Sequence, residues 1–276
     1  MNGRVVIFAG SPGMSGAAVL CARGALRGGA GLVRVCAPST VQSVIAAAEP
    51  CVMTCALMDS PLAELTPDVA RQAFELVEWA DVVAVGPGLG QSSGATELVS
   101  EIIKNSGRPL VVDADGLNAL SKISDWWSQR PTADGCGSLI VTPHPGEFER
   151  LARGAGLPPL SGESDAARIA AAAAYAERAD CVVVLKGHRT VVTDAKRVYV
   201  NRSGNPGMAT GGMGDVLTGL IAALLGQGLA AFDAAQLGVH CHSAAADALV
   251  DAVGPIGYLA SEVADAIPTA LSLHIC

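Results

Sequence analysis

The amino-acid sequence predicts a doubly wound α/β fold, in which a central, mainly parallel β-sheet has helices on both faces. Two observations carry this prediction. Short runs rich in Val, Ile and Leu recur along the 276 residues, and alanine-rich segments with helical character lie between them. Nearly continuous apolar runs indicate strands buried on both faces, and their alternation with helices is typical of a parallel sheet. No linker or low-complexity segment divides the chain, so a single domain over residues 1–276 is expected.

The elements follow one another in a regular order. Val and Ile favour strands and alanine favours helices, which assigns the apolar runs and the segments between them. The clearest helices are expected in the alanine-rich segments 16–30 and 164–179 and in the apolar run 216–225. The expected strands are RVVIFAG (4–10), GLVRVCAP (31–38), DVVAVGPG (81–88), PLVVDAD (109–115), GSLIVTPH (137–144), DCVVVLKG (180–187) and RTVVTDA (189–195).

Composition excludes several classes of protein. A formal net charge of −8 argues against nucleic acid as a partner. The amino terminus, MNGRVVIFAG, is typical of a buried strand rather than a signal peptide, and the apolar stretch 217–225 is too short to span a bilayer. Eight cysteines occur without a C-x-x-C pair, which favours buried free thiols in a reducing cytosol. A cytoplasmic protein that does not bind membranes is therefore expected.

Five of the expected strands end in clusters of glycine and polar residues. These ends are FAGSPGMSG, AVGPGLG, VVDADG, VTPHPGE and VLKGHRT. Ligands of open parallel sheets bind beyond the carboxyl ends of the strands, so the five ends predict one continuous rim for a large ligand. Tight turns would explain the glycines and prolines of any one end, but they explain the accompanying polar residues poorly.

The stretch NPGMATGGMGDVLTGLIAALLGQG, at 205–228, suggests a phosphate site. Gly211, Gly212 and Gly214 stand just before an apolar helix, and the free N–H groups of a helix N-terminus form an anion hole. Asp215 is unexpected there, because a carboxylate repels phosphate. It fits a base that removes a proton from a hydroxyl attacking phosphorus. A plain helix cap is an equally open interpretation from this stretch alone.

The other strand ends add candidate contacts. Lys186, followed by Gly187, suits a nucleotide, although an ordinary exposed lysine is the alternative. His144 and Glu147 lie on one turn, which either starts a helix with Pro145 in its first position or contacts Mg²⁺ and substrate; both interpretations can hold together.

Two further segments carry weaker signals. Asp113, Asp115 and Asn118 follow one strand and suggest contact with a cation or a ribose, although Asp at such a place is often only a helix cap. In GPGLG, the glycines Gly86, Gly88 and Gly90 allow close approach of the backbone to a ligand, which alone is weak evidence.

With these residues in hand, the sequence resembles the ADP/ATP-dependent NAD(P)H-hydrate dehydratases of the ribokinase-like superfamily. The resemblance runs in family order over most of the chain. It rests on GSPGMSGAAVLCARGALRGGAGLV, VGPGLG, VVDADGLNAL, VTPHPGEFERL, VVLKGHRTVV and GNPGMATGGMGDVLTGLIAALL. It implies a ribokinase-like fold and a repair reaction, the dehydration of (6S)-NADHX and NADPHX to NADH and NADPH. The nucleotide phosphorylates the ring hydroxyl, and phosphate is then eliminated.

The resemblance also implies roles for residues. Asp215 is similar to the family's base. The hydrate contacts carried over are Ala17, Gly88, His144 and Asp215, and Ala17 is exchangeable with Gly16 or Ala18. The nucleotide contacts carried over are Lys186, Gly187, His188, Arg189, Thr190 and Gly214. Phosphoryl transfer implies Mg²⁺, for which Glu147 is the candidate ligand, directly or through water.

Two features depart from the family pattern. The chain starts almost at the first strand, where relatives often have a Lys- and Gly-rich lead-in; a trimmed chain or a late assigned start would account for this. Many bacterial relatives also carry an epimerase domain before this one, and none is expected here. Functional pairing with a separate NAD(P)HX epimerase is therefore expected. ADP is favoured over ATP as the donor by association with bacterial members. Relatives often form tetramers, which implies a homo-oligomer.

Two rival functions remain at this point. A kinase for a small vitamin alcohol would share the fold, the glycine-rich helix start and the base, but its product would stay phosphorylated. A non-catalytic sensor of ADP or ATP would bind the nucleotide alone. Retention of Asp215 disfavours the sensor, and His144 with the GPGLG loop disfavours the kinase.

Overall fold

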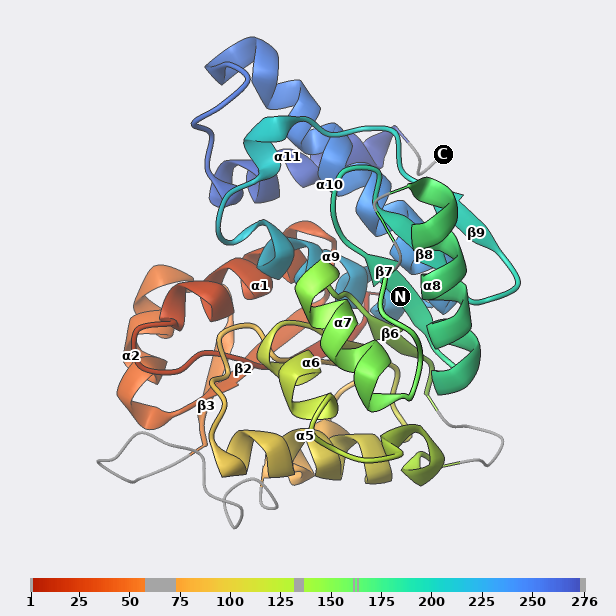
Figure 1. Ribbon diagram of the computed structural model, residues 1–276. Coiled ribbons are helices and arrows are strands. Elements are labelled where there is room, and N and C mark those ends of the chain that lie inside the picture. The colour runs from red at the N-terminus through yellow and green to blue at the C-terminus, as the bar shows by residue number, and fades with distance from the viewer. Residues whose placement is uncertain (1, 58–72, 132–136, 161, 163, 274–276) are drawn as a thin grey trace.

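The computed structural model describes residues 2–57, 73–131, 137–160, 162 and 164–273. Its strands form one nine-stranded sheet in the order β3-β2-β1-β4-β5-β6-β7-β8-β9 (Figure 1). The strands from β3 to β7 in this order are parallel, and β8 and β9 are antiparallel additions at one edge. The strands are β1 (Arg4–Phe8), β2 (Leu32–Ala37), β3 (Met53–Ala56), β4 (Val82–Val85), β5 (Leu110–Val112), β6 (Leu139–Val141), β7 (Val182–Leu185), β8 (Val191–Thr193) and β9 (Val198–Val200).

All seven strands expected from the sequence are present, and the mainly parallel sheet is confirmed. The two that the sequence did not reveal, β3 and β9, are the outermost strands of the sheet. Both are partly exposed and short. An edge strand need not be apolar on both faces, so these two lack the continuous Val and Ile runs that marked the others.

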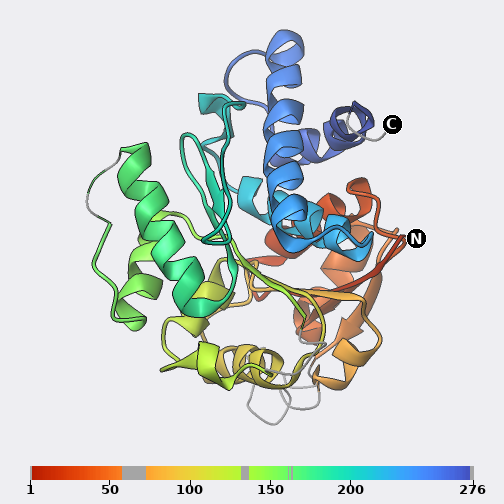
Figure 2. The ribbon, with the colours of Figure 1, turned by 90° about the vertical axis from the view of Figure 1, so that its right-hand side faces the viewer.

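Helices cover both faces of the sheet, as expected (Figure 2). Each face has its own hydrophobic cluster, because alternate residues of a strand point to opposite sides. One face carries α1 (Ser15–Arg27), α2 (Ser39–Ala48), α9 (Met213–Gly226), α10 (Ala231–Val253) and α11 (Ala260–Ser272). The other carries α4 (Glu75–Glu78), α5 (Ser93–Asn105), α6 (Asp115–Leu120), η1 (Trp126–Gln129), α7 (Pro145–Gly154) and α8 (Asp165–Ala179), while η2 (Pro206–Met208) precedes α9.

Helices α1 and α9 pack backbone against backbone. A Cβ atom added at Gly24 would lie 2.2 Å from the carbonyl oxygen of Val216, and one at Gly219 would lie 1.8 Å from that of Cys21. Both distances are too short for any side chain, so glycine is required on both helices. This contact fixes the first half of α9 beside the second half of α1.

The cysteines only partly match the expectation of buried thiols. Cys21, Cys36, Cys181 and Cys241 are buried and free, but Cys51 is exposed and Cys55 is half-exposed, while Cys136 and Cys276 lie outside the described residues. The expectation was wrong for these two because they lie on and just before β3, at the edge of the sheet. Among the described helices, none is long and apolar enough to cross a membrane.

Candidate functional site

The five glycine- and polar-rich strand ends meet along one edge of the sheet. They follow β1, β4, β5, β6 and β7, which are consecutive neighbours in the sheet and parallel. Backbone hydrogen bonds join adjacent ends directly: the N–H of Gly10 donates to the carbonyl of Pro87 at 2.9 Å, and that of Lys186 to Pro143 at 2.8 Å. The continuous rim expected from the sequence is confirmed.

An ion pair lies at the centre of this rim. Nζ of Lys186 is 2.6 Å from Oδ1 of Asp113, and Oδ2 of Asp113 accepts a 2.7 Å hydrogen bond from the Thr218 hydroxyl. Only 1% of the Asp113 side chain and 20% of that of Lys186 are exposed. Lys186 is therefore not an ordinary surface lysine. The cation that Asp113 contacts belongs to the protein itself.

Asp215 lies in the first turn of α9, close to this pair. The N-cap of α9 is Gly212, whose φ of +92° few other residues adopt, so Asp215 is not the cap. Burial raises the pKa of Asp215 to about 7, and the charge of Asp113 adds to the rise while Lys186 opposes it. A carboxyl group with this pKa exchanges protons readily near neutral pH.

The N-terminus of α9 opens toward the same pair. A Cβ atom at Gly214 would lie 3.2 Å from Nζ of Lys186 and 3.6 Å from Oδ2 of Asp113, whereas one at Gly211 would meet nothing within 4 Å. The glycines therefore keep the space between the helix end and the ammonium group free of side chains. Free N–H groups of the first helical turn and an ammonium group together suit phosphate oxygens.

His144 and Glu147 begin α7, so the expected helix start with Pro145 as its first residue is confirmed. The ring Nδ1 of His144 accepts hydrogen bonds from the first turn, and Oε2 of Glu147 accepts one of 2.8 Å from the His144 N–H. The same Oε2 lies 4.0 Å from Nζ of Lys186. Burial raises the pKa of Glu147, and the charge of Lys186 opposes this rise. Glu147 thus borders the central ion pair from the β6 side.

Ala17 and Gly88 touch each other at the β1–β4 part of the rim. Gly88 has φ of +58°, and a Cβ atom there would lie 2.9 Å from Cβ of Ala17 and 2.8 Å from the carbonyl oxygen of Met14. The Ser11 hydroxyl donates to the carbonyl of Gly88 at 2.8 Å. This contact brings the start of α1 and the GPGLG loop together, as one wall of the rim.

The GPGLG loop also contacts the neighbouring segment on its other side. The N–H of Gly90 donates to Oδ2 of Asp115 at 2.9 Å, and Asn118 donates to Oδ1 at 3.2 Å. Asp115 and Asn118 therefore hold the loop in place, while Asp113 alone of this segment reaches Lys186.

Hydrogen bonds from Arg168 support the backbone of the loop from Lys186 to Thr190. The sequence did not reveal Arg168 as a site residue. The Arg168 guanidinium of α8 is buried and donates to the carbonyl of Leu185, at the end of β7, and to those of three loop residues, Lys186, His188 and Arg189. A signal was present, since Arg168 is a single cation on the buried face of an alanine-rich helix. Thr218 was missed for a similar reason, as one hydroxyl within an apolar run.

The segment before α9 is fixed by its own contacts. Oδ1 of Asn205 accepts a 2.6 Å hydrogen bond from the Tyr258 hydroxyl, and its amide donates to Oδ1 of Asp247 at 2.9 Å. The N–H of Gly204 donates to the other carboxylate oxygen of Asp247 at 2.7 Å. The approach to the glycine-rich turn is thereby anchored to α10.

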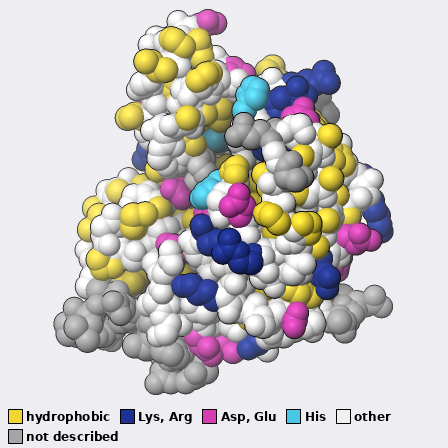
Figure 3. All heavy atoms as spheres, in the orientation of Figure 1, with side chains coloured by type: hydrophobic (Ala, Val, Ile, Leu, Met, Phe, Trp, Pro, Cys, Tyr) yellow, Lys and Arg dark blue, Asp and Glu magenta, His cyan; other side chains and the backbone are white. Residues whose placement is uncertain are grey.

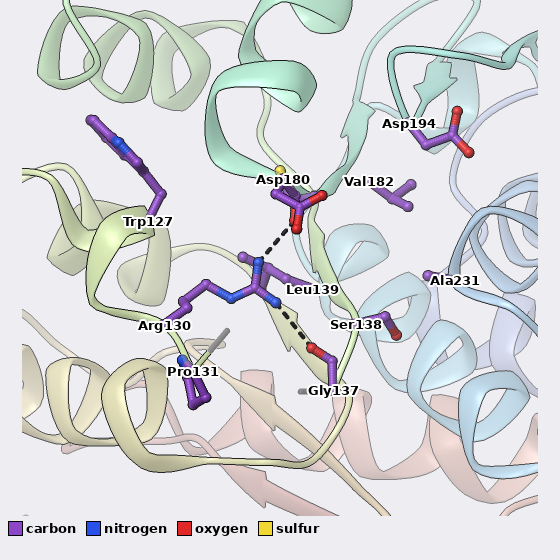
Figure 4. Close-up of a pocket in the computed structure, with 11 residues that line it drawn as sticks. Trp127, Arg130, Pro131, Gly137, Ser138, Leu139, Asp180, Val182, Asp194 and Ala231 are labelled. Atoms are coloured by element: carbon purple, nitrogen blue, oxygen red, sulfur yellow. Dashed lines mark hydrogen bonds between the residues drawn. The ribbon is translucent and has the colours of Figure 1, made fainter. Parts of the chain in front are cut away.

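A cavity of about 510 Å³ lies elsewhere in the molecule (Figure 4). It is lined by residues at the amino ends of β6 and β7, including Ser138, Asp180 and Cys181, and by Trp127 and Arg130. Arg130 donates to the carbonyls of Asp180 and Gly137, at 2.8 and 2.9 Å. The site residues follow the carboxyl ends of the same parallel strands, so this cavity belongs to the opposite edge of the sheet.

Comparisons with known proteins agree with this arrangement. The family model described as NAD(P)H-hydrate dehydratase matches residues 5–269. The chain is 41% identical, over 98% of its length, to a bifunctional NAD(P)H-hydrate repair enzyme of Moorella thermoacetica, of which it covers 49%. It is 38% identical, over 96% of its length, to an ADP-dependent (S)-NAD(P)H-hydrate dehydratase of Neisseria meningitidis, of which it covers 83%. The chain thus spans about half the length of the bifunctional relatives that it matches.

Solved structures share the fold over the whole chain. A ribokinase-like superfamily protein of Enterococcus faecalis superimposes with a TM-score of 0.79 at 27% identity, covering 99% of this chain and 87% of that one. An ADP/ATP-dependent NAD(P)H-hydrate dehydratase of Bacillus subtilis, co-crystallised with ATP and Mg²⁺, superimposes with a TM-score of 0.78 at 29% identity, covering 99% and 90%. The fold is therefore ribokinase-like.

Proposed function

This chain belongs to the NAD(P)H-hydrate dehydratase family, and we propose that it uses a nucleotide to convert (6S)-NADHX and NADPHX back to NADH and NADPH. The observation that carries the proposal is the position of Asp215. Its carboxyl group lies in the first turn of α9, near the Lys186–Asp113 pair, with its pKa raised by burial to about 7. A proton acceptor at a phosphate-binding helix end is what phosphorylation of an alcohol requires.

In the proposed reaction, the carboxylate of Asp215 takes the proton of the ring hydroxyl while the hydroxyl oxygen attacks the terminal phosphorus of the nucleotide. The bond between this phosphorus and its bridging oxygen breaks, and the nucleotide leaves with one phosphate fewer. The ring then carries a phosphate ester in place of a poor leaving group. Phosphate departs with the electron pair of its C–O bond, and loss of a proton from the neighbouring ring carbon forms the double bond. Lys186 and the N–H groups at the start of α9 balance the negative charge that collects on the phosphoryl oxygens.

The rim offers two ends for two ligands. We assign the nucleotide to the Lys186–Thr190 loop and Gly214, with the anion hole formed by Gly211, Gly212 and Gly214. We assign the hydrate to the wall where Ala17 touches Gly88 and to His144, whose side chain is half-exposed at the edge of the rim. Asp215 directly follows Gly214 in the first turn of α9, beside the proposed phosphate contacts, which suits a group that serves the transfer.

The residues at the rim fit a magnesium ion that travels with the nucleotide. Mg²⁺ in phosphoryl-transfer sites takes one or two carboxylates together with substrate phosphates and waters. No cluster of three or more His, Cys, Asp or Glu suited to a metal occurs within the described residues. Oε1 of Glu147 lies 3.4 Å from Nε2 of His144 at the edge of the rim, and Glu147 would hold the ion, directly or through water. The ion would supply positive charge to the phosphoryl oxygens.

Several finer points belong to the same proposal. ADP is the proposed donor, supported by the relative from Neisseria meningitidis named as ADP-dependent. A homo-oligomer is supported by hydrophobic side chains gathered at the end of the molecule formed by α10 and α11 (Figure 3), where Val253, Ile256 and Leu259 are exposed. Relatives named as bifunctional repair enzymes support functional pairing with an epimerase. The tetramer and the cytoplasmic location stay predictions.

The test is regeneration of the reduced nicotinamide. The protein is incubated with NADHX, Mg²⁺ and either ADP or ATP, and the absorbance of the reduced nicotinamide ring is followed. We expect it to return with the wild type and not with Asp215→Asn, while calorimetry shows that the variant still binds nucleotide. Asp251→Asn, at an exposed carboxylate in the last turn of α10, is the control and should stay active.

The rival functions give different results in the same assay. Phosphorylation of a thiazole or pyrimidine alcohol with no turnover of NADHX would establish the vitamin kinase instead. Nucleotide binding without turnover of either substrate would establish a sensor. Full activity of Asp215→Asn would refute the role of Asp215 as the base but leave the dehydration itself in place.

A further inference from the structure

Two cysteine side chains face each other across neighbouring strands at the edge of the sheet. Cys36 in β2 and Cys55 in β3 are register partners in a parallel pair, so their side chains leave the same face of the sheet. Both pack against the hydrophobic cluster of the face that α5 and α7 cover. Neighbouring strands lie about 4.8 Å apart, which is within the Cα separation of about 4.4–6.8 Å that a disulfide bond spans.

The two thiols have unequal surroundings. Cys36 is fully buried, while Cys55 is half-exposed on the edge strand. A hydrogen bond between the two thiols lowers the pKa of Cys55 to about 6 and raises that of Cys36, and burial raises the pKa of Cys36 further. The pair thus favours ionisation of Cys55 and keeps Cys36 protonated. A reactive nucleophile and a protonated partner thus stand side by side.

A positive charge stabilises this arrangement. Arg34 lies two residues before Cys36 in β2, so it leaves the sheet on the same face as the two thiols. Its guanidinium group stacks on the ring of Trp79, with 4.1 Å between the guanidinium carbon and the ring centre. The charge of Arg34 favours the thiolate of Cys55. Reactive cysteines are typically found in such electropositive, partly exposed surroundings.

We propose that Cys36 and Cys55 form a reversible disulfide bond when the protein meets hydrogen peroxide. The thiolate sulfur of Cys55 attacks the peroxide oxygen, the O–O bond breaks, and Cys55 becomes a sulfenic acid while the peroxide is reduced to water. The sulfur of Cys36 then attacks the sulfenic sulfur, its proton joins the departing hydroxyl group, and a second water leaves. Two thiols and one peroxide thus yield one disulfide and two waters, and a dithiol reductant reverses the change.

The disulfide would link the edge strand β3 to β2, which is hydrogen-bonded to the segment leading into the Ser11 loop. The carbonyl of Cys36 accepts a hydrogen bond of 3.3 Å from the N–H of Ala9, which leads into the loop carrying Ser11. Formation of the disulfide does not depend on the proposed function, because its chemistry needs only the two cysteines and the oxidant. Failure of one proposal therefore leaves the other in place.

The test follows the thiols directly. The reduced full-length protein is treated with a small excess of hydrogen peroxide at neutral pH, digested without reductant and analysed by mass spectrometry. We expect a cross-linked peptide pair that contains Cys36 and Cys55 and disappears on treatment with dithiothreitol. We also expect the alkylation rate of Cys55 by iodoacetamide to reach half of its plateau near pH 6.

Three variants assign the steps. Cys36→Ser should leave a sulfenic acid on Cys55 that dimedone traps, whereas Cys55→Ser should leave Cys36 unoxidised. Cys51→Ser removes an exposed thiol four residues from Cys55 and is the matched control; it should not change the rate of cross-linking. A wild-type cross-link from Cys55 to Cys51, or oxidation that spares Cys55, would overturn the proposal. These outcomes are read from the wild type, so they hold even if Cys36→Ser fails to fold.

Discussion

The ammonium group of Lys186 lies 2.6 Å from Oδ1 of Asp113, although the two residues follow strands that are separated by a third. The pair spans the β6 end of the rim, and its two charges act in opposite directions on the pKa values of Asp215 and Glu147. Burial works against the charge of Lys186, yet Asp113 and Glu147 raise the pKa of this lysine. The ammonium group is therefore charged over the whole physiological range, as a phosphate contact requires.

Removal of this cation should destabilise the fold. Lys186→Ala leaves Asp113, which is 1% exposed, without its ionic partner, and breaking such a buried pair costs about 3 kcal/mol. The measurement is urea unfolding at neutral pH. Lys104→Ala, at an exposed lysine of α5, is the control and should change the free energy of unfolding little. Equal stability of the two variants would show that the pair contributes nothing.

The activity should rise with pH through about 7. The carboxyl group of Asp215 must be ionised to accept a proton, and burial holds its pKa at about 7 in the free protein. The dependence of kcat/KM on pH reports the groups of the free enzyme, so its rising limb should have an apparent pKa near 7. A rising limb near the ordinary pKa of an Asp would contradict the assignment.

The same shift predicts a pH-dependent effect of Asp215→Asn on stability. The folded protein keeps a proton on Asp215 up to about pH 7, but the unfolded chain loses it near 3.8. Stability from the protonated group is complete below the unfolded value and is lost as pH rises through the folded value. The variant cannot ionise, so its stability relative to the wild type should increase from pH 4 to 7 and level off above. Urea unfolding at several pH values measures this, and a constant difference would disprove it.

Arg168 should act as a positioning residue for nucleotide binding. Arg168→Lys keeps the positive charge but cannot donate to four carbonyls in the same fork geometry. We expect the dissociation constant of the nucleotide to rise about tenfold, for the loss of about 1.4 kcal/mol, with a smaller change in kcat. Calorimetry measures the first and the absorbance assay the second. Arg178→Lys, on the exposed side of the same helix, should change neither.

Gly88→Ala should weaken binding of the hydrate selectively. The new methyl group would lie 2.8 Å from the Met14 carbonyl oxygen and 2.9 Å from Cβ of Ala17, and the φ of +58° is itself unfavourable for alanine. The start of α1 must therefore shift, so we expect a higher KM for NADHX with unchanged nucleotide affinity. Gly156 has a similar positive φ but open space around it, so Gly156→Ala controls for the backbone strain that alanine causes at such a φ. If the KM for NADHX rose equally in both variants, the contact between Gly88 and Ala17 would have no specific role in binding the hydrate.

The sequence predicted the strands between which the site lies because their interior position leaves a continuous apolar pattern. The edge strand β3 escaped detection because it is partly exposed. Its position decides the exposure of Cys55 and its pairing with Cys36, so buried thiols were expected where the structure has one buried and one half-exposed cysteine side by side.

For the site, the sequence indicated which residues lie at the rim but not which of them meet. Asp113 and Lys186 were singled out separately, and only the strand order brings them together. Arg168 stood out only as a single cation on the buried face of an alanine-rich helix, and its role was not predictable because its partners are backbone carbonyls, which carry no signature in the sequence. Sequence motifs thus indicate residues at a ligand site, but they do not indicate residues such as Arg168 that support the backbone of that site.

The glycine contacts between α1 and α9 limit how the two helices can move. With Gly24 against Val216 and Gly219 against Cys21, the two helices have no gap in which to slide or hinge. Ala17 on α1 and Asp215 on α9 therefore belong to two helices that cannot shift against each other without breaking these contacts. The relative position of these two proposed ligand contacts is thus set when the protein folds.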